Sequence, residues 1–344
     1  MTSGQTPSPP GPTGQGRAGQ TGRAGMTLAV VSAATFGTSG TFATSLIDAG
    51  WSPGAAVLAR IGAAALVLTV PGLMALRGRW GQLRRSLPRV AGYGLFAVAG
   101  AQLCYFNAIQ RIPIGVALLL EYLGVVLVVG WMWLRHAQRP RRLTVAGAVT
   151  ALAGLGLVLD LSGSARLSLL GVMWGLLAAV GLAVYFVLSA DADADALPPI
   201  AMAWAGMCVG AALLGVLGLA GVLPMRAATG DVQFLHHQVS WTVPVAGLAL
   251  VAAVIPYVTG IGAARRLGAR LSSFVGMAEV LFAVLFAWLL LGQLPTVMQF
   301  AGGALILGGV ALVRLAELRE PAARPEPGHD SDTDAGLADA LARS

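Results

Sequence analysis

The chain has 344 residues, of which 56% are hydrophobic and 11% are charged, and its mean hydropathy is +0.76. Water-soluble domains carry roughly 25% charged residues, so this composition excludes an ordinary soluble enzyme, and the apolar fraction is too high for a disordered chain. The net charge of +7 rests on 22 arginines without a lysine, and the placement of these arginines decides what the charge means.

Residues 1–25 are rich in Gly, Pro, Thr and Gln and are predicted to form a disordered tail. Ten apolar segments follow, each close to the ~20 residues that a helix needs to cross ~30 Å of hydrocarbon. Continuously apolar runs favour helices over alternating strands as the spanning structure. Residues 317–344, rich in acids and prolines, form a second predicted disordered tail. In chain order the predicted spans cover residues 26–46, 54–76, 90–110, 113–134, 143–161, 168–190, 198–221, 242–263, 271–291 and 296–316.

The arginines predict how the chain lies across the membrane, because short loops rich in Arg stay on the cytoplasmic side. With the N-terminus inside, 18 of the 22 arginines fall in cytoplasmic segments. Arg111, Arg166 and Arg226 fall outside, and Arg60 lies within a span. The basic charge is therefore a topology signal that places both termini in the cytoplasm, and no nucleic-acid partner is expected.

The chain is also predicted to contain an internal duplication. An offset of 155 residues superimposes 101–135 on 256–290, and an offset of 145 fits the earlier parts. Two halves of five helices, residues 26–161 and 168–316, must cross the membrane in opposite directions because five is odd. Inverted repeats are typical of secondary transporters, which rock about a site near the midplane. The register persists to Pro140 with Pro295, Gly147 with Gly302, and Gly154 with Gly309.

Several of these features resemble a known family. The duplicated five-helix unit, its Gly-rich last helices and the runs Tyr-Phe-Asn-Ala at 105–108 and Ala-Glu-Val-Leu-Phe-Ala at 278–283 are similar to the drug/metabolite transporter superfamily, specifically its EamA-type members. The resemblance covers about residues 26–316. It implies a ten-helix permease of the bacterial inner membrane with cytoplasmic termini, often one that exports amino acids or other small metabolites.

One short segment resembles a branch of that family more closely. Leu-Glu-Tyr-Leu-Gly at 120–124 is similar to the fourth helix of the amino-acid-exporting branch. Val125 stands where that branch usually has proline, and Val280 stands where a proline often follows the equivalent glutamate of the ninth helix.

Two glutamates lie deep inside predicted spans, where a charge costs at least ~2.5–3.5 kcal/mol. Glu121 is in the fourth segment and Glu279 in the ninth, which are repeat equivalents. A carboxyl group shielded from water can hold a substrate amine or exchange a proton, and we predict these roles for both. The alternative is a protonated glutamate that bonds only to a neighbouring carbonyl.

Four further side chains and one arginine complete the predicted site. Arg60, in the second segment, is a candidate ligand for a glutamate or a substrate carboxylate; the alternative is a structural role or a side chain that reaches the headgroups. Three tyrosines and one asparagine are predicted to line the site, because a tyrosine offers a substrate an apolar wall with one hydrogen-bonding group. The alternative is that these side chains form helix contacts or anchor the protein at the membrane interface. They are Tyr105, Asn107, Tyr185 and Tyr257.

An enzymatic function is not expected. The run Gly-Thr-Ser-Gly at 37–40 matches the nucleophile pattern of rhomboid proteases, but all four histidines lie in loops or the tail, which leaves Ser39 without a base. His236 and His237 with Asp231 offer an external metal site, although adjacent histidines project apart. No metal or cofactor is predicted.

The sequence thus predicts an all-α integral membrane protein of ten transmembrane helices in two inverted five-helix repeats. Its predicted function is secondary transport that exports an amino acid, a related compound or a drug-like amine by alternating access, with protons as a candidate coupling ion. The alternatives are an uptake permease for a nutrient or nucleotide-linked solute, and a membrane-embedded binding or sensory protein. The predicted partners are a small-molecule substrate and the lipid bilayer.

Overall fold

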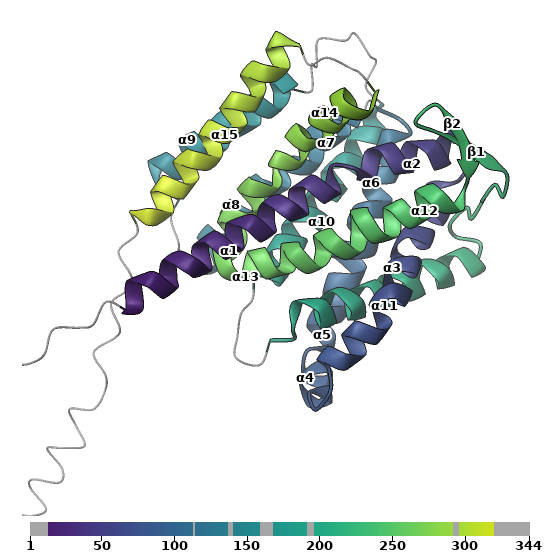
Figure 1. The fold of residues 1–344 in the computed structure, drawn as a ribbon, viewed down its shortest axis with the longest axis horizontal. Coiled ribbons are helices and arrows are strands. Elements are labelled where there is room, and N and C mark those ends of the chain that lie inside the picture. Colours follow the sequence, from purple (N-terminus) through teal and green to yellow (C-terminus); the bar gives the residue numbers. More distant parts are fainter. Residues whose placement is uncertain are drawn as a thin grey trace, which may run out of the picture.

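The computed structural model describes residues 13–112, 114–136, 140–158, 168–190, 196–291 and 296–319, and these residues are mostly helical (Figure 1). The first half comprises α1 (Thr13–Phe36), α2 (Ser39–Asp48), α3 (Pro53–Ala75), α4 (Trp80–Arg85), α5 (Leu87–Gly92), the π-helix η1 (Tyr93–Gly100), α6 (Ala101–Ile109), α7 (Ile114–Tyr122), α8 (Gly124–His136) and α9 (Arg142–Val158). The second half comprises α10 (Leu169–Ser189), α11 (Pro199–Leu219), the strands β1 (Asp231–Phe234) and β2 (His237–Ser240), α12 (Thr242–Ala249), the π-helix η2 (Leu250–Val254), α13 (Ile255–Gly276), α14 (Ala278–Leu291) and α15 (Val297–Leu318).

Six helical segments among the described residues are long and apolar enough to cross a membrane, which makes the chain a multi-pass membrane protein. Two more apolar helices, Arg142–Leu157 and Phe300–Val313, are shorter. The predicted segment 90–110 is divided by a π-helix, and the predicted segment 271–291 is divided by a break, so the count of ten spans stays a prediction. The six are Gly22–Asp48, Pro53–Ala75, Ala117–Arg135, Leu169–Ser189, Pro199–Leu219 and Thr242–Gly276.

The N-terminal helix is longer than the sequence indicates. α1 begins at Thr13, so residues 13–25 extend the first helix where a disordered tail was expected. Once the apolar span has formed a helix, further hydrogen-bonded turns propagate outward from it at little cost per residue.

Three helices that reach the interior are broken rather than continuous. α1 gives way to α2 at 37–38, α7 to α8 at Leu123, and α13 to α14 at Met277. None of the three breaks contains a proline. At the first, the Thr38 hydroxyl donates to the Thr35 carbonyl oxygen at 2.7 Å, a local bond that competes with the helical ladder.

The two π-helices occupy matching places in the two halves. Under the 155-residue offset, Ala97 in η1 corresponds to Ala252 in η2. A π-turn widens the helix and leaves carbonyl oxygens free for other donors, which is why such turns gather at functional sites. Both of these alanine carbonyls accept hydrogen bonds from side chains of the interior.

Small residues bring helices of the two halves into backbone contact, as is usual in membranes. α9 and α15 lie side by side at one edge of the molecule (Figure 1). A Cβ atom on Gly147 would lie 2.7 Å from the Gly309 carbonyl oxygen, and one on Gly154 would lie 2.6 Å from the Gly302 carbonyl oxygen. The two contacts exchange repeat-equivalent glycines, which is the pattern that a two-fold axis produces.

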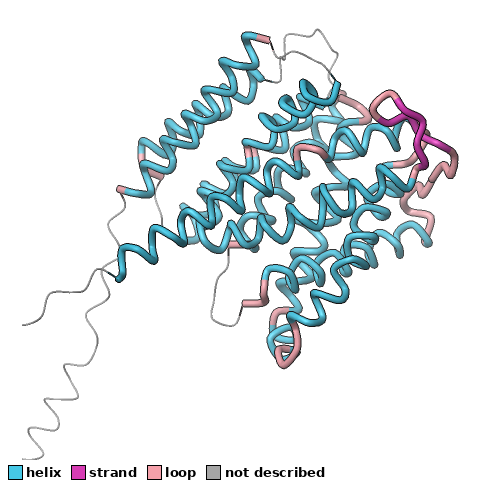
Figure 2. Tube along the Cα trace, in the orientation of Figure 1, coloured by secondary structure: helices cyan, strands magenta, loops and turns pink. Residues whose placement is uncertain are grey.

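The loop between α11 and α12 contains the described strands, an antiparallel hairpin at one end of the molecule (Figure 2). Phe234 pairs with His237, so the turn has two residues, Leu235 and His236, with φ of 47° and 67°. Such two-residue turns usually carry Asn or Gly, because side chains are strained at positive φ. Trp51 ties this loop to the rest of the protein, because its indole donates to the Ala228 carbonyl oxygen at 2.9 Å.

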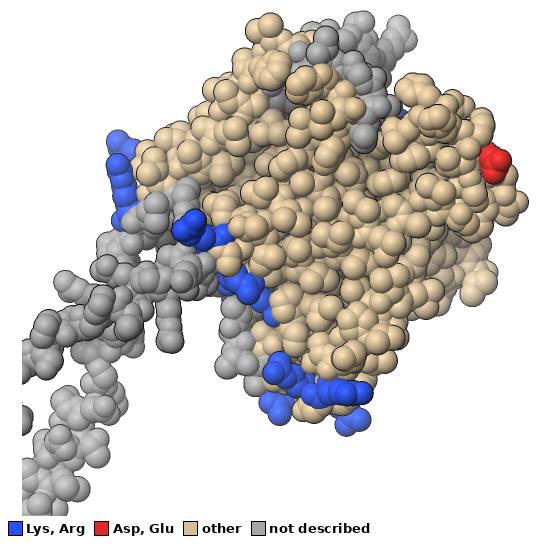
Figure 3. Space-filling view, in the orientation of Figure 1, with Lys and Arg blue, Asp and Glu red and all other residues tan. Residues whose placement is uncertain are grey.

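Many of the described arginines lie at the opposite end from the hairpin, whereas Arg60 lies in the interior and Arg226 lies in the loop that contains the hairpin. Figure 3 shows basic side chains along the lower left edge of the molecule and an acidic side chain beside the hairpin. The basic end includes the short helix α4 with Arg84 and Arg85. It also includes Gly268, where φ is 78° and a non-helical kink interrupts α13. This end is the one that the sequence assigns to the cytoplasm.

Candidate functional site

A cavity of about 720 Å³ lies between the two halves and extends toward the hairpin. Side chains of α1, α2, α3, α6 and α7 line it from the first half, and side chains of α10, α13 and α14 line it from the second. Its volume falls within the range of ~300–1,000 Å³ that is usual for small-molecule sites.

Arg60 is held in the wall of this cavity by uncharged oxygens. Its Nη1 donates to Ser39 Oγ at 2.9 Å and to Gln102 Oε1 at 2.6 Å, and its Nη2 donates to the carbonyl oxygen of Ala252 in η2. The ring of Phe36 lies 5.9 Å from the guanidinium carbon. Arg60 is fully buried, and leaving any one of these oxygens unpaired would cost about 1–3 kcal/mol.

Glu279 lies next to the break between α13 and α14. Its Oε2 accepts a hydrogen bond from the Tyr122 hydroxyl at 2.8 Å, and this hydroxyl also lies 3.0 Å from the Gly276 carbonyl oxygen. Tyr122 closes α7 at the matching break of the first half. The pair therefore connects the two broken helices across the boundary between the halves.

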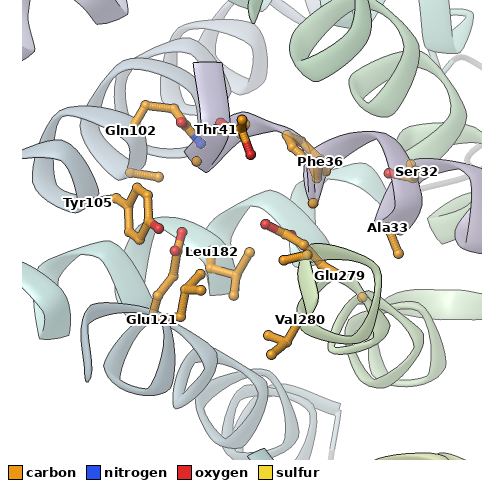
Figure 4. A pocket seen from close by; sticks show the side chains of 18 of the residues that line it. Ser32, Ala33, Phe36, Thr41, Gln102, Tyr105, Glu121, Leu182, Glu279 and Val280 are labelled. Atoms are coloured by element: carbon orange, nitrogen blue, oxygen red, sulfur yellow. The ribbon is translucent and has the colours of Figure 1, made fainter. Parts of the chain in front are cut away.

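Glu121 precedes Tyr122 and lines the cavity from the opposite side. In Figure 4 the carboxyl groups of Glu121 and Glu279 both point into the cavity, and the ring of Tyr105 stands beside Glu121. Both glutamates are half-buried, whereas Arg60 exposes no surface. The carboxyl groups, unlike the guanidinium, are thus accessible from the cavity.

Aromatic rings form a continuous part of the wall. The Tyr257 ring centroid lies 5.4 Å from that of Phe36 and 5.6 Å from that of Tyr185, both in edge-on geometry. The Tyr257 hydroxyl donates to the Ala97 carbonyl oxygen in η1 at 3.4 Å. Gly260 leaves space for this arrangement, because a Cβ atom there would collide with the Tyr185 hydroxyl.

The hairpin forms the outer end of the cavity. Phe234 stacks on Phe42 of α2 with ring centroids 5.1 Å apart. Gln233, Leu235 and Asp48 lie in the same part of the wall. Substrate that enters from the hairpin side would pass these side chains.

Six of the seven residues predicted from the sequence line this cavity: Arg60, Tyr105, Glu121, Tyr185, Tyr257 and Glu279. Asn107, the seventh, does not line the cavity, so the structure corrects its assignment to the site. Its amide nitrogen donates to the Leu103 carbonyl oxygen at 2.9 Å, and its amide oxygen accepts from Arg111 at 3.2 Å. It lies two residues beyond Tyr105, so on a helix turning 100° per residue it faces away from the cavity.

The polar partners of Arg60 and Glu279 were not predicted from the sequence. Gln102 and Tyr122 both line the cavity and bond to Arg60 and Glu279, respectively. Gln102 carried a usable signal, because an amide in the middle of an apolar run needs a partner. Tyr122 stood beside the predicted Glu121 but had no feature that separated it from an interface tyrosine.

The residues that suggested a protease or a metal site have other surroundings in the structure. Ser39, whose sequence run matches the rhomboid nucleophile pattern, accepts a hydrogen bond from Arg60, and none of the described residues that line the cavity is a histidine. His236 and His237 are exposed at the hairpin turn. Within the described part of the chain, no three His, Cys, Asp or Glu side chains form a metal-binding group.

Comparison with known proteins points to one family. The model of the EamA-like transporter family matches two segments, residues 23–160 and residues 169–315, which together span most of the chain. The chain is 27% identical over 234 residues to an uncharacterized inner membrane transporter, YicL, of Salmonella typhimurium, covering 65% of this chain and 73% of that protein. It is 29% identical over 232 residues to an uncharacterized transporter of Archaeoglobus fulgidus, covering 67% and 77%.

The fold is also present in a solved structure. A protein of known crystal structure superimposes with a TM-score of 0.66 and 24% identity, covering 87% of this chain and 99% of that one. The arrangement of the helices therefore follows a fold that already exists among experimental structures.

Proposed function

We propose, from the premise that the chain belongs to the EamA-like transporter family, that it is a secondary transporter that exports a small amine-bearing metabolite by alternating access. The observation that carries this proposal is the cavity between the two halves, into which a carboxyl group from each half projects. Amino acids and drug-like amines share the ammonium group that such carboxyl groups recognise.

Alternating access by two inverted five-helix repeats is supported by contacts that recur between the halves. Gly37 of the first helix packs on the backbone of Glu279, where a Cβ atom would lie 2.9 Å from the carbonyl oxygen. Gly124 packs on Ala179 and Leu182 of α10 in the equivalent way, with 2.6 Å to the Ala179 carbonyl oxygen. Leu182 is the repeat equivalent of Gly37, and Gly124 that of Glu279. A pseudo-two-fold relation between ten helices accounts for both contacts.

The broken helices favour a binding site near the midplane. Glu121 and Glu279 each lie within two residues of a break, at Leu123 and Met277. Discontinuous helices carry the substrate sites of many secondary transporters, because their free backbone groups and side chains face a cavity instead of lipid. We assign substrate or proton binding to these two glutamates.

We further propose the bacterial inner membrane as the location, with both termini in the cytoplasm. The relative YicL is an inner membrane transporter, and the basic side chains visible in Figure 3 lie along one edge, as the positive-inside rule leads one to expect. The hairpin then faces the outside.

Counterflow in proteoliposomes tests the proposed function. Vesicles containing the full chain are loaded with one member of a panel of amino acids, polyamines and cationic drugs, and uptake of the labelled solute is followed. We expect at least one solute to show counterflow above protein-free vesicles. Saturable binding of a solute without its counterflow would contradict transport and favour a sensory protein.

The direction of transport needs a separate measurement. In intact cells that overproduce the chain, export predicts a lower internal concentration of the transported solute than in cells without it. A higher internal concentration would contradict export and identify an uptake permease.

A further inference from the structure

The cavity offers unequal partners to the two ends of an amino acid. A carboxylate would need Arg60, whose guanidinium already donates to Ser39, Gln102 and Ala252. No part of Arg60 is exposed to the cavity. The Nε atom of Arg60 pairs with no oxygen of the described residues, but a carboxylate can reach the guanidinium only if the side chains that cover it move.

An ammonium group, in contrast, meets accessible acceptors. Glu121 and Glu279 project into the cavity from α7 and α14, and both are half-buried. Glu279 accepts one hydrogen bond, from Tyr122, through Oε2. A carboxylate has about four lone-pair sites on its two oxygens, so it can accept from an ammonium group as well.

The rest of the wall suits the body of an organic cation. Phe36, Tyr185, Phe186 and Tyr257 line the cavity, and Phe186 lies 5.0 Å from Tyr185 between ring centroids. Aromatic rings attract cations through their faces and pack against apolar groups, which is how proteins recognise substituted ammonium ions. The cavity therefore combines two carboxyl groups with an aromatic wall.

We infer that the cavity selects organic ammonium ions that lack a carboxylate over amino acids and over carboxylic acids. Arg60 is then a positioning residue: it joins α2, α3, α6 and η2 and touches no substrate. The inference rests on the proposed transport function and narrows its substrate class from amine-bearing metabolites to amines without an acid group.

Matched sets of ligands test the inference on the purified full chain in detergent by isothermal titration calorimetry. The first set is phenethylamine, phenylalanine and 3-phenylpropionate, which differ only in the amine and the carboxylate. The second is tryptamine, tryptophan and indole-3-propionate, which fill more of the cavity. We expect at least one amine to bind at least about tenfold more tightly than its amino acid, because the amino acid brings a carboxylate into a cavity whose described basic side chain, Arg60, exposes no surface.

Variants separate site binding from partition into the detergent. Glu121→Gln and Glu279→Gln should each weaken amine binding by about tenfold or more, which is the size expected for a charge-assisted hydrogen bond. Asp231→Asn removes the same charge from an exposed residue outside the cavity wall and should change binding by less than about twofold. Size-exclusion profiles confirm that each variant is folded.

Three results would overturn the inference: binding of either amino acid as tight as that of its amine, absence of binding by both amines, or unchanged binding in both glutamate variants. Counterflow distinguishes it from the proposed function. Selective amine binding without counterflow would contradict transport and leave the inference intact, whereas counterflow of a neutral or anionic solute alone would contradict the inference and leave transport intact.

Discussion

At the scale of single residues, Arg60 has the contacts of a structural residue, which is the role that the sequence analysis named as its alternative. The sequence predicted a buried charge whose partner is a glutamate, a substrate carboxylate or, in a structural role, another part of the protein, because charges in spans are costly. The structure places Arg60 in the cavity wall with three uncharged oxygens on three elements. One of them is the Ala252 carbonyl oxygen in the π-helix η2, and no sequence pattern predicted a π-helix there.

The roles of Arg60 as a structural residue and as a ligand predict different results for Arg60→Gln. Glutamine is too short to reach all three oxygens, so we expect the ligand-free protein to lose about 2 kcal/mol or more of stability. Thermal unfolding in detergent measures this loss. Arg111→Gln is the control, since the exposed Arg111, in the turn after α6, donates to Asn107 four residues earlier. An unchanged melting temperature, with weaker binding of carboxylate-bearing solutes only, would assign Arg60 as a substrate ligand.

At the scale of the elements, the sequence predicted helical segments well and their interruptions poorly. Each long described helix overlaps a predicted apolar run, because hydropathy reports lipid contact, although α13 extends across two of the predicted runs. The breaks at Leu123 and Met277 lack proline, so no local residue type marked them. The hairpin was also missed, since its turn residues are Leu235 and His236 instead of Asn and Gly.

Two adjacent glycines of α15 test the packing between α9 and α15. In Gly309→Ala the new methyl group would lie 2.6 Å from both the Ala151 Cβ atom and the Gly147 carbonyl oxygen, so we expect a loss of about 1–3 kcal/mol. Gly308→Ala is the matched control, because a Cβ atom there meets nothing within 4 Å, and alanine favours a helix by up to about 1 kcal/mol. Equal melting temperatures for the two variants would contradict the close contact between α9 and α15.

The hairpin is expected to control the outer mouth of the cavity. Phe42→Cys and Phe234→Cys, combined in a chain whose Cys104 and Cys208 are replaced by serine, place two thiols where the rings now stack. A short bifunctional thiol reagent that joins them should reduce counterflow several-fold, and a cleavable reagent should restore it on reduction. Each single cysteine variant is the control. Full counterflow with the joined hairpin would mean that substrate enters by another route.

At the scale of the whole molecule, the predicted duplication relates positions in one half of the chain to positions in the other. The offset of 155 residues pairs Gly147 with Gly302 and Gly154 with Gly309, and in the structure these four glycines lie at the contact between α9 and α15. It did not foresee Tyr122, which bonds to Glu279 across the halves, because an offset compares positions and does not say which of them meet. Contacts between halves arise from packing, which no single-sequence pattern contains.

The central claim is that Glu121 and Glu279 bind the substrate ammonium group or a coupling proton during transport. The most direct test is solute flux in proteoliposomes with an imposed pH gradient, comparing the parent chain with Glu121→Gln combined with Glu279→Gln, and with Asp231→Asn as the charge-matched control. We predict that the double variant loses pH-dependent flux by about tenfold or more, whereas the control retains it. Unchanged pH-dependent flux in the double variant would contradict the claim.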